Sequence, residues 1–205
     1  MPLGAFKATL LGASGGGDLV GDEFVQLNEE TNAGSAPSSV TLTSAGAAIS
    51  WEAFDHLFVT IDARSRTSSN QEEAYFRING ISTGNLYFGS RHQWVGGGGG
   101  SYGGGYSYAS QEQMAFGNFI GENQDQGCYG HSELVFYNIN SDKFKNVRSF
   151  TCGSPGGSSS NTIYNAIWNV TVKTTDPVTS LYFSLWSNAW TQYSEFAVYG
   201  IGAPE

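Results

Sequence analysis

Apolar and polar residues alternate along much of this chain with a period of two. In one stretch, Leu57, Val59 and Ile61 fall on one face of an extended strand, whereas Thr60 and Asp62 fall on the other. Successive side chains of a β-strand point to opposite faces, so this alternation predicts strands with one buried and one exposed face. No segment longer than a few residues has the 3.6-residue apolar period of an amphipathic helix.

Roughly ten short strands are expected, separated by clusters of Gly, Ser, Asn and Asp. Clear alternation covers residues 55–64, 73–79, 132–139, 146–152, 163–173, 180–187 and 194–201, and weaker patterns cover 23–29, 39–44, 46–51, 85–94 and 114–120. Residues 140–145 predict the turn of a hairpin. The regular spacing of turn signals indicates an all-β fold, an antiparallel β-sandwich that is jelly-roll-like, rather than a parallel sheet.

A glycine tract interrupts the middle of the chain, where residues 94–110 read WVGGGGGSYGGGYSYAS. Strand patterns occur on both sides of it, and neither side holds enough strands to form a core alone. The tract is therefore expected to be one long loop within a single domain and not a linker between two domains. That domain is expected to span residues 23–205.

Residues 1–22 differ from the rest, because a short apolar stretch is followed by glycines and precedes the strand series. They are expected to form an N-terminal arm. Free termini fray unless they are tied down, so an arm of this kind is expected to dock on a neighbouring subunit or on a larger particle. The apolar residues that would make the contact are Leu3, Phe6, Leu10 and Leu11.

Composition and charge exclude several classes of partner. Charged residues are 13% of the chain, and the formal net charge is −9. There is no basic run, so nucleic-acid binding and attachment to anionic membranes are not expected. No apolar run approaches the ~20 residues of a membrane-spanning helix. The N-terminal segment is too weakly apolar and basic to predict a secretory signal.

Two catalytic motifs match in their residue pattern but lack the structural context that each motif requires. Residues 12–16 read GASGG, but a nucleophile elbow requires a strand-to-helix turn, and no helix pattern follows. Gly98, Gly100 and Gly103 match a dinucleotide-binding pattern, yet no βαβ unit surrounds them. No catalytic residue and no cofactor are expected, and the chain is expected not to be an enzyme.

The histidines and cysteines do not form a recognisable ligand set. His56, His92 and His131 are scattered, so no metal site is expected. Cys128 and Cys152 are the only cysteines and flank the expected hairpin. A disulfide between them is geometrically possible, and two free thiols are the alternative.

Aromatic residues near glycines and turns are the candidates for contact with a ligand or partner. They are Trp94, Tyr102, Tyr106, Tyr108 and Trp190. Tyr and Trp offer a large, rigid contact area with a polar group, which suits either a sugar ring or another protein. Three alternatives stay open: the rings cap one end of the sandwich, contact another subunit, or contact a glycan.

Three stretches carry a resemblance to a known group of proteins. Residues 56–65 (HLFVTIDARS), 76–80 (FRING) and 193–201 (YSEFAVYGI) resemble jelly-roll-like structural proteins of tailed bacteriophages, notably phages of marine bacteria and cyanobacteria. The resemblance spans about residues 48–201 and rests on structural motifs, not catalytic ones. It implies a capsid-decorating or tail-associated virion protein that often forms trimers.

These observations together give two functional expectations. The first is a non-enzymatic virion protein, a decoration or cement protein assembled in the host cytoplasm, that forms a homotrimer and contacts the major capsid protein or other virion proteins. The second is a carbohydrate-binding module that uses its loop aromatics to adhere to a host surface glycan.

Overall fold

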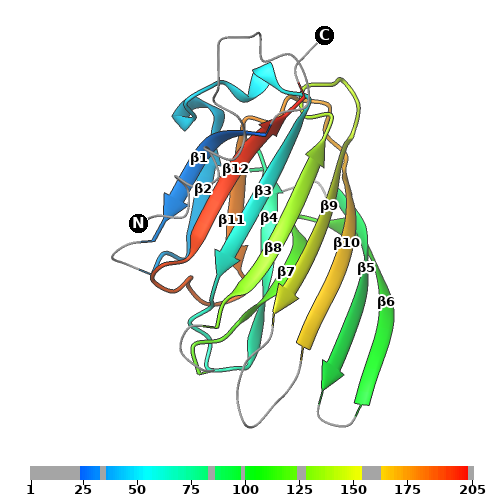
Figure 1. Ribbon diagram of the computed structural model, residues 1–205. Helices are drawn as coiled ribbons and strands as arrows, with labels where there is room; N and C mark the ends of the chain where they lie inside the picture. Colours follow the sequence, from blue (N-terminus) through cyan, green and yellow to red (C-terminus); the bar gives the residue numbers. More distant parts are fainter. Residues whose placement is uncertain are drawn as a thin grey trace.

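A computed structural model describes residues 24–32, 36–82, 86–97, 100–123, 128–153 and 163–202 of the protein. Two antiparallel sheets lie face to face (Figure 1). The large sheet has eight strands, in the order β1 (Val25–Thr31), β12 (Glu195–Ile201), β3 (His56–Ala63), β8 (Gly130–Tyr137), β9 (Lys145–Gly153), β10 (Ile163–Val172), β5 (Tyr87–Gly97) and β6 (Gly100–Gln111). The small sheet has four strands, β2 (Ser39–Thr43), β11 (Ser180–Leu185), β4 (Gln71–Ile78) and β7 (Met114–Ile120). The expected all-β sandwich is confirmed.

The strand order is that of a jelly roll with two inserted hairpins. Without the hairpins β5–β6 and β9–β10, the remaining strands are ordered β1-β12-β3-β8 in one sheet and β2-β11-β4-β7 in the other. This is the order produced when a long hairpin of eight strands folds into two sheets. Both inserted hairpins join the same edge of the large sheet, next to β8, and widen that sheet alone.

The core lies between the sheets and follows the alternation of the sequence. Leu57, Val59 and Ile61 are fully buried on the inner face of β3, whereas Asp62 is exposed on its outer face. Aromatic rings from both sheets meet edge to face, as in the pair Phe76 and Phe136, whose ring centroids are 5.5 Å apart. Edge-to-face pairs add to the stabilisation that burial alone provides.

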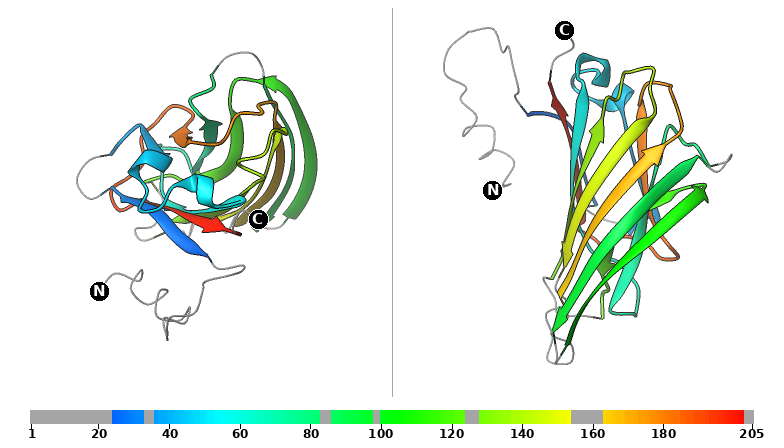
Figure 2. Two further views of the ribbon diagram at one scale, coloured as in Figure 1. Left: turned by 90° about the horizontal axis from the view of Figure 1, so that it is seen from above. Right: turned by 90° about the vertical axis from the view of Figure 1, so that its right-hand side faces the viewer.

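The added strands of the large sheet curve around the β7 edge of the small sheet (Figure 2). Ser149 and Thr151 on β9 both donate hydrogen bonds to the Phe116 carbonyl oxygen on β7, at 2.8 Å each. A side chain at Gly117 would overlap Thr151, so only glycine allows the two strands to approach this closely. The small sheet is thus closed at this edge by the large one.

Two local predictions are wrong. Residues 46–51, expected to form a strand, contribute instead to two short 3-10 turns, η1 (Ser44–Gly46) and η2 (Trp51–Ala53). Side-chain oxygens of Thr43 and Ser50 accept backbone hydrogen bonds at their starts, and such local bonds compete with a strand ladder.

The glycine tract is also not a long loop. Its described residues belong to β5 and β6, which pair along nearly their full length, from Tyr87 with Gln111 to Gly97 with Gly100. β5 pairs in turn with β10. Backbone hydrogen bonds need no side chain, so a tract that carries no alternation can still extend a sheet when a neighbouring strand provides the pairing partners.

Cys128 and Cys152 are free thiols, each half-buried. Of the two alternatives for this pair, the structure has the free thiols.

Candidate functional site

The structure describes only some of the residues that were expected to make contacts. Leu3, Phe6, Leu10 and Leu11 lie outside the described residues. Trp94 lies on β5 and is 49% exposed. Tyr102 and Tyr106 are part of β6.

Two other members of that set are packed into the protein. Tyr108 is half-buried, and its ring lies 5.6 Å from that of the buried Trp168. Trp190 is fully buried, with its ring 5.2 Å from Phe119 and 5.1 Å from Phe196. The prediction that Trp190 contacts a ligand or partner is therefore wrong. Its backbone forms an isolated bridge with Ser65, which draws this part of the turn into the core.

The most exposed tryptophan is Trp186, four residues earlier in the same turn. Its exposed fraction is 69%, the largest among the large hydrophobic residues of the described chain. Its backbone N–H donates to the Glu73 carbonyl oxygen at 3.0 Å, which continues the pairing of β11 with β4. This register sets the Trp186 ring beside Tyr75, with 5.6 Å between ring centroids and 41° between ring planes.

A cleft of about 460 Å³ lies against these two rings. Its other lining residues are Thr67, Ser69, Gln71, Glu72, Glu73 and Ser187. They come from β4, from the segment that precedes it and from the turn that follows β11. Hydroxyl, amide and carboxylate groups thus border two aromatic faces.

Glu72 holds the turn that carries Trp186. One of its carboxylate oxygens accepts four hydrogen bonds, from the backbone N–H and side chain of Ser187 and of Asn188, at 2.7 to 3.1 Å. The other accepts one from the Ser65 hydroxyl. Burial by itself raises the pKa of Glu72, but the hydrogen bonds from Ser65, Ser187 and Asn188 outweigh it and lower the pKa below the ordinary value. Glu72 is therefore an ionised anchor for the turn.

Glu73 points to the other side of β4 and fixes Tyr75. It accepts a hydrogen bond from the Tyr75 hydroxyl and pairs with Arg91 at 3.0 Å. The Arg91 guanidinium in turn lies 4.9 Å from the centre of the Trp168 ring. Burial, and then the hydrogen bond and charge of Glu73, raise the pKa of Tyr75, so its hydroxyl stays protonated. The aromatic wall of the cleft is thus held in place by an ion pair and a buried ring.

One polar atom at the cleft has no hydrogen-bond partner in the part of the chain that the structure describes. The side-chain oxygen of Gln71 accepts no hydrogen bond from any described residue. Buried polar atoms are nearly always bonded to protein or water, so such an atom needs a partner from solvent or from a ligand. The cleft can accordingly hold a molecule that offers an apolar face to the rings and hydroxyl groups at its edge.

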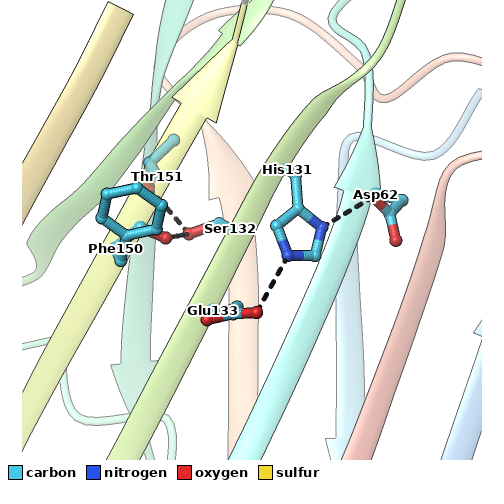
Figure 3. Close-up of polar contacts among 6 residues, drawn as sticks. All are labelled: Asp62, His131, Ser132, Glu133, Phe150 and Thr151. Atoms are coloured by element: carbon cyan, nitrogen blue, oxygen red, sulfur yellow. Dashed lines mark hydrogen bonds and ion pairs between the residues drawn. The ribbon is translucent and has the colours of Figure 1, made fainter.

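A second polar cluster lies on the outer face of the large sheet (Figure 3). The two ring nitrogens of His131 bond Asp62 at 2.8 Å and Glu133 at 3.4 Å. The Asp62 hydrogen bond contributes most to raising the pKa of His131; burial opposes it, and the Asp62 charge and Glu133 add to it. Ser132 points to the opposite face, where its hydroxyl bonds Thr151 and the Phe150 carbonyl oxygen. The pair His131 and Ser132 is therefore not arranged as a base and its nucleophile.

The cysteine beside this cluster is not activated either. Burial, and then the charges of Glu133 and Asp62, raise the pKa of the Cys152 thiol, which keeps it protonated. Within the described ranges, no group of three or more His, Cys, Asp or Glu side chains gathers so as to hold a metal ion. No helix in the same ranges is long and apolar enough to cross a membrane.

No protein-family model matches the sequence, and no significant similarity to a curated protein or a solved structure is found. The fold and the cleft thus define this protein only as a jelly-roll β-sandwich with an exposed aromatic site on its small sheet.

The exposed tryptophan of this turn is Trp186 and not Trp190, and the sequence carries a signal for it. Leu181, Phe183 and Leu185 alternate as buried residues of β11. Continued by one residue, the same alternation puts Trp186 on the outer face. Its neighbour Tyr75 is 111 positions away in sequence, and only the register of β4 with β11 brings the two rings together.

Proposed function

We propose that the protein is a non-enzymatic carbohydrate-binding protein and that the cleft beside Trp186 and Tyr75 receives the sugar. The observation that carries this proposal is the exposure of Trp186, at 69%, beside a second ring and a border of hydroxyl and amide groups. A tryptophan this exposed gains little stability from folding, because most of its apolar surface stays in water. A ligand that covers the ring would recover that surface.

Sugar rings suit this cleft in shape and chemistry. One face of a pyranose presents C–H groups that pack on an aromatic ring, and its edge presents hydroxyls that donate and accept hydrogen bonds. Thr67, Ser69 and Gln71 offer both donors and acceptors at the rim. Glu72 brings a negative charge, Glu73 is paired with Arg91, and the chain carries a net charge of −9. Neutral glycans are therefore favoured over sulfated or uronic-acid glycans, which these charges would repel.

The test is a glycan array followed by titration calorimetry of any ligand found. Trp186→Ala is expected to weaken binding at least tenfold, because it removes the larger ring of the cleft. Trp94→Ala is the matched control, since Trp94 is also an exposed tryptophan, at 49%, but lies on β5 and does not line the cleft. The proposal fails if no neutral glycan binds, or if Trp94→Ala weakens binding and Trp186→Ala does not.

A second proposal concerns where the protein acts. We propose that it is a virion protein of a tailed bacteriophage that decorates the capsid or the tail, with residues 1–22 as an attachment arm that contacts other virion proteins. The jelly-roll strand order supports this proposal, because it agrees with the fold that the sequence resemblance implies. A glycan site on such a particle would serve adhesion to the host.

Deletion of residues 1–20 tests the attachment arm. The shortened protein is expected to fold as the full chain does, by circular dichroism, and to be lost from purified particles. Normal incorporation of the shortened protein into particles would exclude the anchoring role.

A further inference from the structure

The two sheets have four edges, and three of them are protected against pairing with another strand. β1 has an irregular register between Gln26 and Asn28 and carries Glu29 and Glu30. β2 has only five residues. The edge of β7 is covered by β9, through the two hydrogen bonds to the Phe116 carbonyl oxygen. Bulges, charges, short length and coverage are the usual means by which proteins block edge-to-edge association.

The fourth edge, β6, is less protected: within the described residues its one register shift lies near its C-terminal end, between Tyr108 and Gln111, and the strand pairs regularly with β5 from Gly100 to Tyr108. It is the longest strand of the described chain, with 12 residues, and pairs only with β5 in that part of the structure. Its sequence, GSYGGGYSYASQ, has no charged residue and no proline. Along its open side, alternate backbone N–H and C=O groups have no strand partner among the described residues, so they are available to another strand.

The charge distribution favours a second copy of this chain as the partner. The chain carries a net charge of −9, yet residues 87–111, which make up β5 and β6, contain no Asp or Glu. Two copies repel each other least when they meet at this hairpin. Antiparallel pairing of β6 with itself is also self-complementary, as a two-fold interface requires. The acidic residue nearest to the strand, Glu112, would then lie at opposite ends of the paired region in the two copies.

We propose that β6 pairs antiparallel with β6 of a second copy, which joins the two eight-stranded sheets into one continuous sheet across a two-fold axis. Each β6 is used once, so the assembly closes as a dimer and does not grow into a fibre. This proposal does not depend on the carbohydrate site, which lies on the small sheet.

Light scattering after size exclusion, with sedimentation equilibrium for the Kd, tests this pairing. The full chain is expected to be a dimer. Gly105→Lys combined with Ser107→Lys is expected to raise the Kd at least tenfold, because both positions are exposed on β6 and the lysines of the two copies would face each other. An added Cβ at Gly105 meets only the His92 ring, at 3.6 Å, and the Arg91 carbonyl oxygen, at 4.0 Å, so the strand tolerates the change. Ser107→Lys alone provides a second, single variant at an exposed position in the regularly paired part of the strand.

The matched control is Gln26→Lys, at an exposed position on the protected edge β1, and it is expected to leave the Kd unchanged. Melting temperature and near-ultraviolet circular dichroism show whether each variant is folded. A monomer at the highest soluble concentration, or a trimer, would overturn the proposal. So would a dimer that dissociates on deletion of residues 1–22 but not on introduction of the lysines, because the N-terminal segment would then be the occupant of the edge.

Discussion

Replacement of Glu72 by glutamine is expected to destabilise the protein and to disturb the turn that carries Trp186. The carboxylate accepts five hydrogen bonds, and Glu72 is only 7% exposed. Glutamine has nearly the same shape but offers one neutral acceptor in place of two charged oxygens. The change therefore tests the charge and the hydrogen bonds with little change in packing.

The magnitude follows from the difference between charged and neutral hydrogen bonds. A bond to a charged group contributes about 1.5–3 kcal/mol and a neutral one about 0.5–1.5 kcal/mol, so each bond loses about 1 kcal/mol. The five bonds share two oxygens and do not add fully, so the expected loss is about 3 kcal/mol in the free energy of unfolding. Domains are typically stable by only about 5–15 kcal/mol, so this loss is easily measured.

The pH dependence gives an independent check. Because the pKa of Glu72 is lower in the folded protein than in the unfolded chain, its contribution is fully present above the unfolded value of about 4.5. It is lost as the pH falls through the folded value. The difference in unfolding free energy between the native chain and Glu72→Gln is therefore expected to be constant from pH 5 to pH 7. Below about pH 4 it is expected to shrink.

Urea denaturation followed by tryptophan fluorescence measures both the loss in unfolding free energy and its dependence on pH. Glu122→Gln is the matched control, because Glu122 makes a single exposed pair with Arg66 at 3.6 Å, and it is expected to change stability by less than about 0.5 kcal/mol. Equal stability of Glu72→Gln and the native chain at pH 7, or a difference that grows as the pH falls, would refute the reasoning.

Three further predictions use other parts of the structure. Trp190→Ala is expected to lower the unfolding free energy by about 3–5 kcal/mol and Trp186→Ala by far less, because the Trp190 ring is fully buried and the Trp186 ring is 69% exposed. Similar losses for the two variants in urea denaturation would contradict this difference in burial. Gly200→Ala is expected to cost about 1–3 kcal/mol, because the new methyl group would overlap the Phe54 ring, and an unchanged melting temperature would contradict that packing. His131 has a raised folded pKa, so its contribution, at most about 1 kcal/mol at this exposed site, is present below the unfolded value of about 6.5 and is lost as the pH rises through the folded value. The stability difference between the native chain and His131→Gln is expected to decrease from pH 5.5 to pH 8.5, and an increase would show that the two carboxylates do not act on the imidazole as inferred.

The sequence predicts the fold where side chains alternate and misleads where they do not. Residues 55–64 lie in and around β3 with the predicted face buried, because their apolar side chains mark the core directly. The glycine tract offers no such mark, and its strands exist because β10 supplies a backbone partner. Residues 163–172, which form that partner, lie far along the chain, and no local pattern in the glycine tract predicts the pairing.

The cleft could be predicted only in part. The sequence makes Trp190, in the turn after β11, a candidate, whereas the alternation along β11 points to Trp186 as the exposed tryptophan. Tyr75 and Gln71 lie in an ordinary alternating strand, β4, and nothing in their local sequence distinguishes them from other outward residues. Their role depends on the register between two distant strands, which is a property of the whole fold.

The pairing of early strands with late ones has a consequence for synthesis of the protein in the cell. β12, residues 195–201, lies between β1 and β3 in the large sheet, and β11 lies between β2 and β4 in the small sheet. Until β11 and β12 have emerged from the ribosome, the early strands lack their central partners and their inner faces stay open. Folding is thus expected to be slow, as for other folds dominated by long-range pairing, and it cannot be completed before residue 201 is available. A translation pause or truncation before residue 180 would leave β1 to β4 exposed, which makes the nascent chain a natural client for chaperones.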